Sequence, residues 1–262
     1  MEVFDLGNNN LTGAFPQWFN SLPELQVLVL KSNKFHGSIG TSGTVTPCPK
    51  LRILDLSHNN FTRLLPEPYF LNFKALMNVD KSKRLVQYIG DTIYRDSVEL
   101  VLKDNVIEMK YILTVFATID LSYNNFRGEI PNDIGKLQGL RLLNLSHNNL
   151  SGHLPSLLGN LTMLESLDLF KSTHWEIPGV LVSLTFLEVF NLSKNLLVGS
   201  KLMETSLIRF RMILMLEIWD YADYRCQRNV EIVRHNHSHH TRYPKMIMKT
   251  TTLRVDLPGG SF

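Results

Sequence analysis

Residues 116–155 read FATIDLSYNNFRGEIPNDIGKLQGLRLLNLSHNNLSGHLP and carry nearly the same pattern twice, 24 residues apart. From Ile119, and again from Leu143, apolar residues alternate with polar ones until an Asn-Asn pair ends the run. The second leucine of this core returns along the chain at Leu6, Leu30, Leu56, Leu121, Leu145, Leu169 and Leu192. The steps are 24, 26, 65, 24, 24 and 23 residues, so the chain is built from repeats with one long interruption.

The complete repeat is L-x-x-L-x-L-x-x-N-x-L-x-G-x-I-P, which is the leucine-rich-repeat signature near the long end of its usual period. Two-residue alternation and the Gly-x-apolar-Pro endings oppose an amphipathic helix. The pattern predicts an α/β leucine-rich-repeat solenoid, a horseshoe with a parallel β-sheet on its concave face and an irregular or 3-10 convex side. One strand per repeat is expected near residues 5, 29, 55, 120, 144, 168 and 191.

Each constant polar or turn residue of the repeat has a structural reason. The recurring asparagines are expected to bond backbone groups where the chain leaves the sheet: Asn9, Asn33, Asn59, Asn124, Asn148 and Asn195. Glycines suit the turn that follows, where φ is positive: Gly13, Gly37, Gly128, Gly152 and Gly199. Prolines open the convex segment: Pro16, Pro66, Pro131, Pro155 and Pro178.

Composition changes near residue 200. Residues 1–200 hold 17 Lys+Arg against 18 Asp+Glu, whereas residues 201–262 hold 10 against 6, which indicates a boundary. No basic face with interleaved aromatics occurs in the repeats, so a nucleic-acid partner is not expected. Cys48 and Cys226 form neither a disulfide framework nor a zinc spacing.

The endings LTGAFP, FRGEIP and LSGHLP resemble those of plant extracellular leucine-rich repeats. The 65-residue step resembles the island that interrupts the repeats of plant receptor-like proteins of the disease-resistance type. LLPEPYFLNFKAL, YRDSVELVLKDNVIEM and ILTVFATIDLSYNNFRGEIP look like the start, body and end of such an island. The resemblance implies a non-enzymatic module that recognises a peptide or microbial ligand and acts in defence or developmental signalling through partner receptor kinases. It also implies the extracellular face of the plasma membrane.

Several features depart from that family. The chain starts inside a repeat, shows no signal peptide and has no apolar run long enough to cross a bilayer. Membrane attachment would therefore need a segment that this chain lacks, and we expect a product truncated at both ends. The expected organisation is repeats over 1–71, an island over 72–112, repeats over 113–200 and a poorly ordered tail outside the family pattern over 201–262.

Candidate ligand-binding residues lie on the concave strands, where exposed side chains form a continuous surface. The strongest candidates there are Asp120, Tyr123, His147, Phe170 and Lys171. For the Asp and Asn residues of this surface the alternative is a bond to the neighbouring coil. In the island, resemblance favours Tyr94, Arg95 and Asp96, and a structural flap is the alternative. The island is expected to leave the convex or lateral side and to have strand character near 96–103.

Seven Asn-x-Ser/Thr sequons are present. Candidate glycosylation sites are Asn10, Asn60, Asn144, Asn149, Asn160 and Asn191; Asn236 in the tail is not expected to be one. No nucleophile elbow, phosphate loop or paired carboxylates occur, so no catalytic residue, cofactor or metal is expected. The tail contains the histidines His235, His237, His239 and His240, but no carboxylates stand at a useful spacing to support a metal site. A metal hydrolase is therefore the least favoured of the three functions considered. The rival of a receptor module is a secreted leucine-rich-repeat inhibitor or a structural scaffold, and the island discriminates between the two.

Overall fold

The computed structural model describes ten ranges within the unit Met1–Ile232: residues 1–40, 48–77, 88–89, 98–102, 105–109, 112–171, 174–176, 181, 183–192 and 194–198. The second unit, Val233–Phe262, and the whole tail from residue 201 lie outside these ranges, and so do the tail histidines. Among the described residues, no helix has the length and apolar character that a membrane crossing requires.

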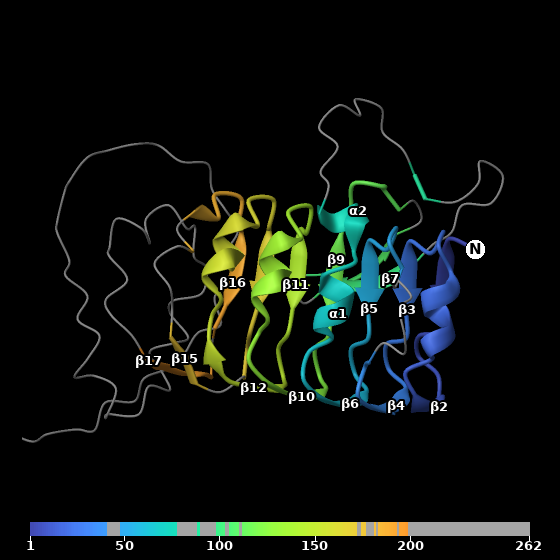
Figure 1. Ribbon diagram of the computed structural model, residues 1–262, viewed down its shortest axis with the longest axis horizontal. Helices are drawn as coiled ribbons and strands as arrows, with labels where there is room; N and C mark the ends of the chain where they lie inside the picture. The colour runs from blue at the N-terminus through green and yellow to red at the C-terminus, as the bar shows by residue number, and fades with distance from the viewer. Residues whose placement is uncertain are drawn as a thin grey trace, which may run out of the picture. The chain divides into compact units, whose positions relative to one another are not determined.

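One parallel sheet runs through all the repeats, with one strand from each coil (Figure 1). Its strands are β1 (Val3–Asp5), β3 (Val27–Val29), β5 (Ile53–Asp55), β9 (Thr118–Asp120), β11 (Leu142–Asn144), β14 (Ser166–Asp168) and β16 (Val189–Asn191), in this spatial order. Asp55 pairs directly with Asp120 across the long interruption, so the inserted residues leave the sheet register intact. The predicted solenoid and all seven strand positions are confirmed.

A second set of short parallel strands follows the turn of each coil. One sheet contains β2 (Thr12–Ala14), β4 (Lys34–Gly37), β6 (Asn60–Arg63), β10 (Asn125–Gly128) and β12 (Asn149–Leu150). Another contains β13 (Gly152–His153), β15 (His174–Glu176) and β17 (Leu196–Val198). Gly37 and Gly128 lie at the ends of their strands with φ of 82° and 85°, the conformation expected from the repeat.

The convex side is made of short helical turns, as predicted. The 3-10 helices are η1 (Gln17–Ser21), η2 (Asn132–Lys136) and η3 (Ser156–Asn160), and the α-helices are α1 (Glu67–Phe70) and α2 (Lys74–Met77). Pro16, Pro66, Pro131 and Pro155 each precede one of these helices. The convex segment of the third coil extends through Met77, because Phe73 and Leu76 are buried in the common core.

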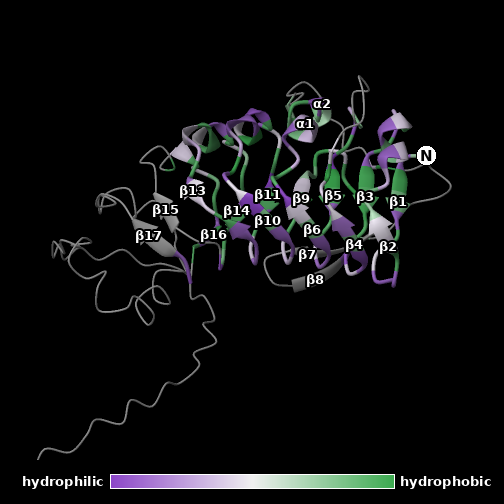
Figure 2. Cartoon of the chain, turned by 60° about the horizontal axis from the view of Figure 1, so that its bottom comes forward, coloured by the Kyte–Doolittle hydropathy of each residue, from purple (hydrophilic) through white to green (hydrophobic). Residues whose placement is uncertain are grey.

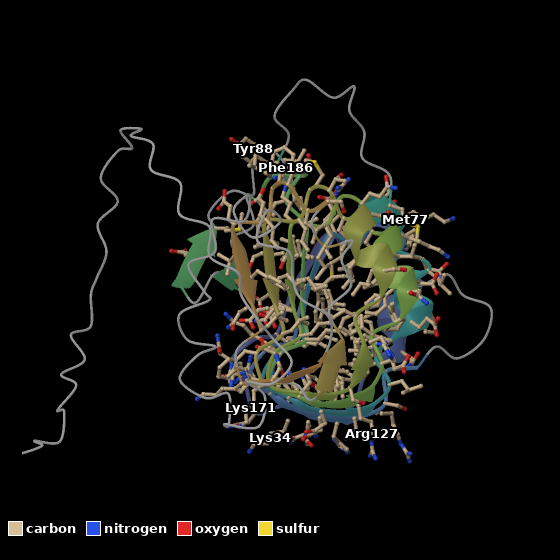
Figure 3. All side chains as sticks on the ribbon, turned by 90° about the vertical axis from the view of Figure 1, so that its left-hand side faces the viewer. Lys34, Met77, Tyr88, Arg127, Lys171 and Phe186 are labelled. Carbon is tan, nitrogen blue, oxygen red and sulfur yellow. The ribbon has the colours of Figure 1, made fainter. Side chains whose placement is uncertain are left out.

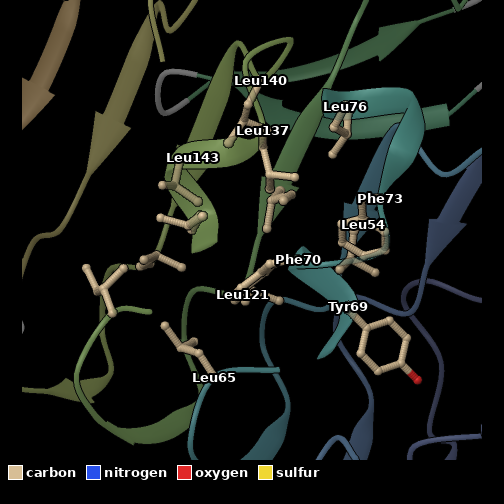
Figure 4. Close-up of a cluster of buried hydrophobic side chains, with 14 of the residues drawn as sticks. Leu54, Leu65, Tyr69, Phe70, Phe73, Leu76, Leu121, Leu137, Leu140 and Leu143 are labelled. Carbon is tan, nitrogen blue, oxygen red and sulfur yellow. The ribbon is translucent and has the colours of Figure 1, made fainter. Parts of the chain in front are cut away.

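The core is a continuous column of leucines and phenylalanines between the concave sheet and the convex helices (Figure 4). Leu54, Ile119 and Leu143 occupy the same place in neighbouring coils and are at most 3% exposed. Phe35, Phe61 and Phe126 form a spine with ring centroids 6.2–6.3 Å apart. Each coil therefore buries its apolar residues only by stacking on its neighbours.

The asparagine ladder forms as expected. Asn148 donates from Nδ2 to the carbonyls of Leu121 and Leu145 at 3.0 and 3.1 Å, and its Oδ1 accepts the Phe126 N–H at 3.1 Å. Equivalent bonds join consecutive coils at Asn33, Asn59 and Asn124. The ladder satisfies backbone groups that lie outside the strand pairing.

The island contains a two-stranded antiparallel hairpin, β7 (Val98–Leu102) with β8 (Asn105–Met109), which confirms the expected strand character. The chain enters the island from the convex side, at the end of α2, and the island's described inner part packs on the concave face. Ile89 and Ile112 form a second buried cluster with Val27, Val29 and Ile53, all at most 2% exposed. These three concave residues alternate with core leucines and therefore point to the opposite face of the sheet.

Candidate functional site

The concave face has two different halves. Over β3 and the start of β5 the outward residues Val27, Val29 and Ile53 are apolar and are buried with the island residues Ile89 and Ile112. Hydrophobic colour accordingly marks β3 and the start of β5 (Figure 2). The remaining repeats line an open groove of about 380 Å³. Its walls are Ser57, His58, Asp120, Ser122, Tyr123, Asn144, Ser146, His147, Asp168, Phe170 and Asn191.

One wall of the groove is a stack of rings. The ring centroids of His58 and Tyr123 are 4.1 Å apart and those of Tyr123 and His147 are 3.8 Å apart, with an interplanar angle of 12° in each pair. His147 continues to Phe170 at 4.8 Å in a tilted contact. His58, Tyr123 and His147 hold the same left-handed position of their repeats, with φ between 51° and 53°. The repeat spacing thus brings residues far apart in sequence into ring contact.

The opposite wall is a row of carboxylates and amides. Asp120 accepts the Ser122 N–H on Oδ1 at 2.9 Å, and its Oδ2 accepts from Asn144 Nδ2 at 3.2 Å. Asn144 and Asp168 likewise accept N–H groups two residues ahead, at 3.1 and 2.9 Å. These bonds tie the row to its own turns and to the next coil.

The two buried carboxyl groups of this row are electrostatically linked. Asp55 is 1% exposed and Asp120 is 7% exposed, on paired positions of adjacent strands. Burial raises the pKa of Asp120 to about 7, and the neighbouring Asp55 adds to the rise. Burial also raises the pKa of Asp55, against hydrogen bonds from Ser57. The pair holds a proton more readily than isolated carboxylates do.

Cationic side chains surround the ring stack at its far end. Lys194 places Nζ 5.3 Å from the Phe170 ring centroid. Lys171 is exposed and extends away from the solenoid (Figure 3). Burial lowers the pKa of His147, and Lys171, His58 and Lys194 lower it further. Burial and the charge of Lys31 lower the pKa of His58 in the same way.

The structure brings together most of the predicted concave residues. Asp120, Tyr123, His147 and Phe170 line one groove, and Lys171 lies beside it. Tyr94, Arg95 and Asp96 lie outside the described residues. The candidate set omitted His58, although it shares its repeat position with Tyr123 and His147. The set of candidate ligand-binding residues also omitted Asp168, Asn144 and Asn191, which line the groove and share the repeat position of Asp120.

The six candidate sequons fall into two groups. Asn144 and Asn191 line the groove, and the side-chain amide of Asn144 donates to Asp120. The other four are exposed, on the lateral turns or at the end of η3: Asn10, Asn60, Asn149 and Asn160. Only this second group leaves the acceptor amide outside the groove.

Family models named leucine-rich repeat match residues 1–61 and, in a second form, residues 117–137 and 139–161. Receptor-like protein 43 of Arabidopsis thaliana is 43% identical over 142 residues, which is 53% of this chain and 19% of that protein. Receptor-like protein 18 of the same plant is also 43% identical, over 54% of this chain and 17% of its own length. The repeats are similar to those of these plant receptor-like proteins. This chain spans less than a fifth of the length of either relative.

Solved structures agree on the fold of these receptor-like repeats. The ectodomain of the Arabidopsis thaliana receptor kinase GASSHO1/SCHENGEN3, in complex with Casparian strip integrity factor 2, matches with a TM-score of 0.56 and 27% identity. That match covers 80% of this chain and 20% of the receptor kinase chain. A TDR receptor matches with a TM-score of 0.58 at 22% identity, over 80% of this chain and 29% of the receptor. Both are leucine-rich-repeat solenoids longer than this chain.

Proposed function

We propose that this chain is a non-enzymatic ligand-recognition module of a plant cell-surface receptor-like protein. The observation that carries the proposal is the open groove over the polar half of the concave face, walled by stacked rings on one side and by Asp and Asn residues on the other. Its size of about 380 Å³ falls in the range of ligand sites. The similar GASSHO1/SCHENGEN3 ectodomain was solved with a bound factor, which supports a recognition role.

The groove fits an extended peptide better than a compact molecule. It reaches from Ser57, beyond β5, to Asn191 in β16 and so crosses five neighbouring strands. Strand spacing of about 4.8 Å makes this about 19 Å, the length of about six residues of extended chain. Peptide N–H groups would donate to the Asp and Asn wall, and side chains would contact the rings.

The wider receptor role is part of the same proposal. By family resemblance the module acts at the extracellular face of the plasma membrane, carries glycans at its exposed sequons and signals through partner receptor kinases. Signalling would serve defence or development. The packing of the island on Val27 and Val29 supports a module whose open surface is confined to the later repeats.

A random heptapeptide display library, selected on the purified 262-residue chain, tests the binding role. We expect enriched peptides whose binding falls about tenfold or more in Tyr123→Ala, since an exposed ring at the centre of a site makes a large contribution. Phe186→Ala is the matched control, because Phe186 is an exposed aromatic outside the groove. Equal binding by the two variants, or no enrichment at all, would refute a recognition groove and favour a scaffold.

A further inference from the structure

The ring wall of the groove offers its edges to a ligand, because its faces are occupied. Tyr123 is stacked on both sides, by His58 and His147, yet its side chain remains 45% exposed. Ring edges carry the positive end of the aromatic quadrupole, whereas the faces carry the negative end. The Tyr123 hydroxyl and the imidazole N–H groups add hydrogen-bond donors at this edge. The wall therefore favours an acceptor or an anion over a cation.

Positive charge collects at the same wall. The groups that act on His147 are the ammonium groups of Lys171 and Lys194 and the imidazole of His58, which is cationic only in acid. In the part of the chain that the structure describes, neither Lys171 nor Lys194 belongs to an ion pair. The ammonium group of Lys194 lies over the Phe170 ring, which places its charge at this end of the groove.

The acidic wall does not cancel this preference, because its oxygens are engaged by the protein. Asp120 binds Ser122 and Asn144, and Asp168 binds the Phe170 N–H. Asp55 lies beneath the surface at 1% exposure and binds Ser57. The carboxylates can still accept N–H groups of a peptide backbone, since each oxygen has a second lone pair.

We infer that the groove selects an acidic peptide, whose carboxylate lies at the His147, Lys171 and Lys194 end, and that it holds this peptide more tightly in acid than at neutral pH. This inference rests on the proposed recognition function and specifies its ligand class.

The groove presents His58, His147, Asp120, Asp168 and Tyr123 to a ligand, and Asp55 lies beside Asp120 on the neighbouring strand. Burial and the nearby lysines lower the pKa of His58 and of His147, so both imidazoles are neutral at pH 7 and gain charge only as the pH falls. Acidification also neutralises Asp120, whose pKa of about 7 lies far above that of a free carboxyl group. Each change makes the groove more positive, so all of them act in the same direction on an anionic ligand.

The test uses the random heptapeptide library on the purified full chain, with selection at pH 5.5 and sequencing of the enriched peptides. We expect enrichment of Asp and Glu. A synthetic copy of an enriched peptide should bind about tenfold more tightly at pH 5.5 than at pH 7.5, because several charges each contribute a factor of a few.

Two variants separate the charge from the architecture. Lys171→Ala combined with Lys194→Ala should weaken the same peptide about tenfold at both pH values, whereas Lys34→Ala on the lateral sheet should not change binding. His147→Tyr keeps the ring stack, since Tyr123 already occupies that repeat position, and should reduce the pH effect to about threefold. Unchanged circular dichroism and urea midpoints show that each variant is folded.

The outcomes are distinguishable. Enriched peptides that depend on Tyr123 but are basic or neutral, or that bind equally at both pH values, overturn the acidic-peptide inference and leave the recognition function standing. If no enriched peptide depends on Tyr123, both the inference and the proposed function fail.

Discussion

Replacing Asn148 by alanine should destabilise the repeats by about 3 kcal/mol, mainly through backbone groups left without partners. Asn148 is 5% exposed and joins two coils through hydrogen bonds to Leu121, Leu145, Ser146 and Phe126. Alanine leaves the Phe126 N–H and the Leu145 carbonyl without a partner among the described residues, at about 1–3 kcal/mol each if water does not reach them, whereas the Leu121 carbonyl still accepts from Asn124 Nδ2. The cavity is small, so the lost hydrogen bonds determine the result.

Two asparagines of the same chain provide matched comparisons. Asn149 is the next residue and is exposed, so Asn149→Ala should change stability by less than about 0.5 kcal/mol. Asn195 occupies the ladder position of the last described coil, but its buried Oδ1 has no hydrogen-bond partner among the described residues. Asn195→Ala should therefore cost about half as much as Asn148→Ala, because no N–H loses its acceptor.

Urea unfolding, followed by circular dichroism on chains produced without glycans, measures the three free energies. Unfolding slopes must agree among the variants, because a solenoid can lose terminal coils separately from its centre. If Asn148→Ala and Asn149→Ala are equally stable, the ladder does not support the fold in the way its hydrogen bonds indicate. If Asn195→Ala is the most damaging of the three, the assignment of the cost to the Phe126 N–H is wrong.

Three further predictions concern the island, the buried acids and the sequons. Val27→Asp should destabilise the protein by about 2–4 kcal/mol and speed hydrogen exchange of the Ile89 N–H, which is bonded to the Ile112 carbonyl at 2.8 Å. Val189 has the same repeat position in the open half of the concave face, and Val189→Asp should cause neither change. Unaltered exchange in Val27→Asp would show that the island does not depend on this contact. The pKa of the Asp120 side chain is 3.8 in the unfolded chain and about 7 in the folded chain, so this group makes stability fall as pH rises from about 4 to about 7. The urea midpoints of Asp120→Asn should therefore vary less with pH across that range than those of the unchanged protein. An equal pH dependence of the two proteins would contradict the raised pKa. Mass spectrometry of the protein secreted from plant cells should find glycans on the exposed sequons, which are those of Asn10, Asn60, Asn149 and Asn160. It should find none on Asn144 and Asn191 in the groove, and glycans there would contradict the prediction.

The regular part of this molecule could be predicted because each repeat residue has one local reason to be there. Leu145 alternates inward, Asn148 bonds the turn, and Pro155 opens the convex segment, whichever coil is considered. These relations involve residues of one coil and its neighbour, 24 residues away. Strand positions and most groove residues follow from them. The omission of His58 was avoidable, because the 65-residue gap hides its position but does not change the repeat.

The covered half of the concave face is a different case. Val29 occupies the position that is acidic or amide in later repeats, such as Asp120 and Asn144, and this contrast signals a covered surface. What covers it could not be read from the repeat, because island residues have no repeated partner that fixes their place. Burial of all five clustered side chains to 2% or less requires the island to lie on the sheet. The insertion therefore does more than interrupt the repeats: it closes the apolar end of the concave surface, and any ligand that lies across the strands must bind between the island and β16.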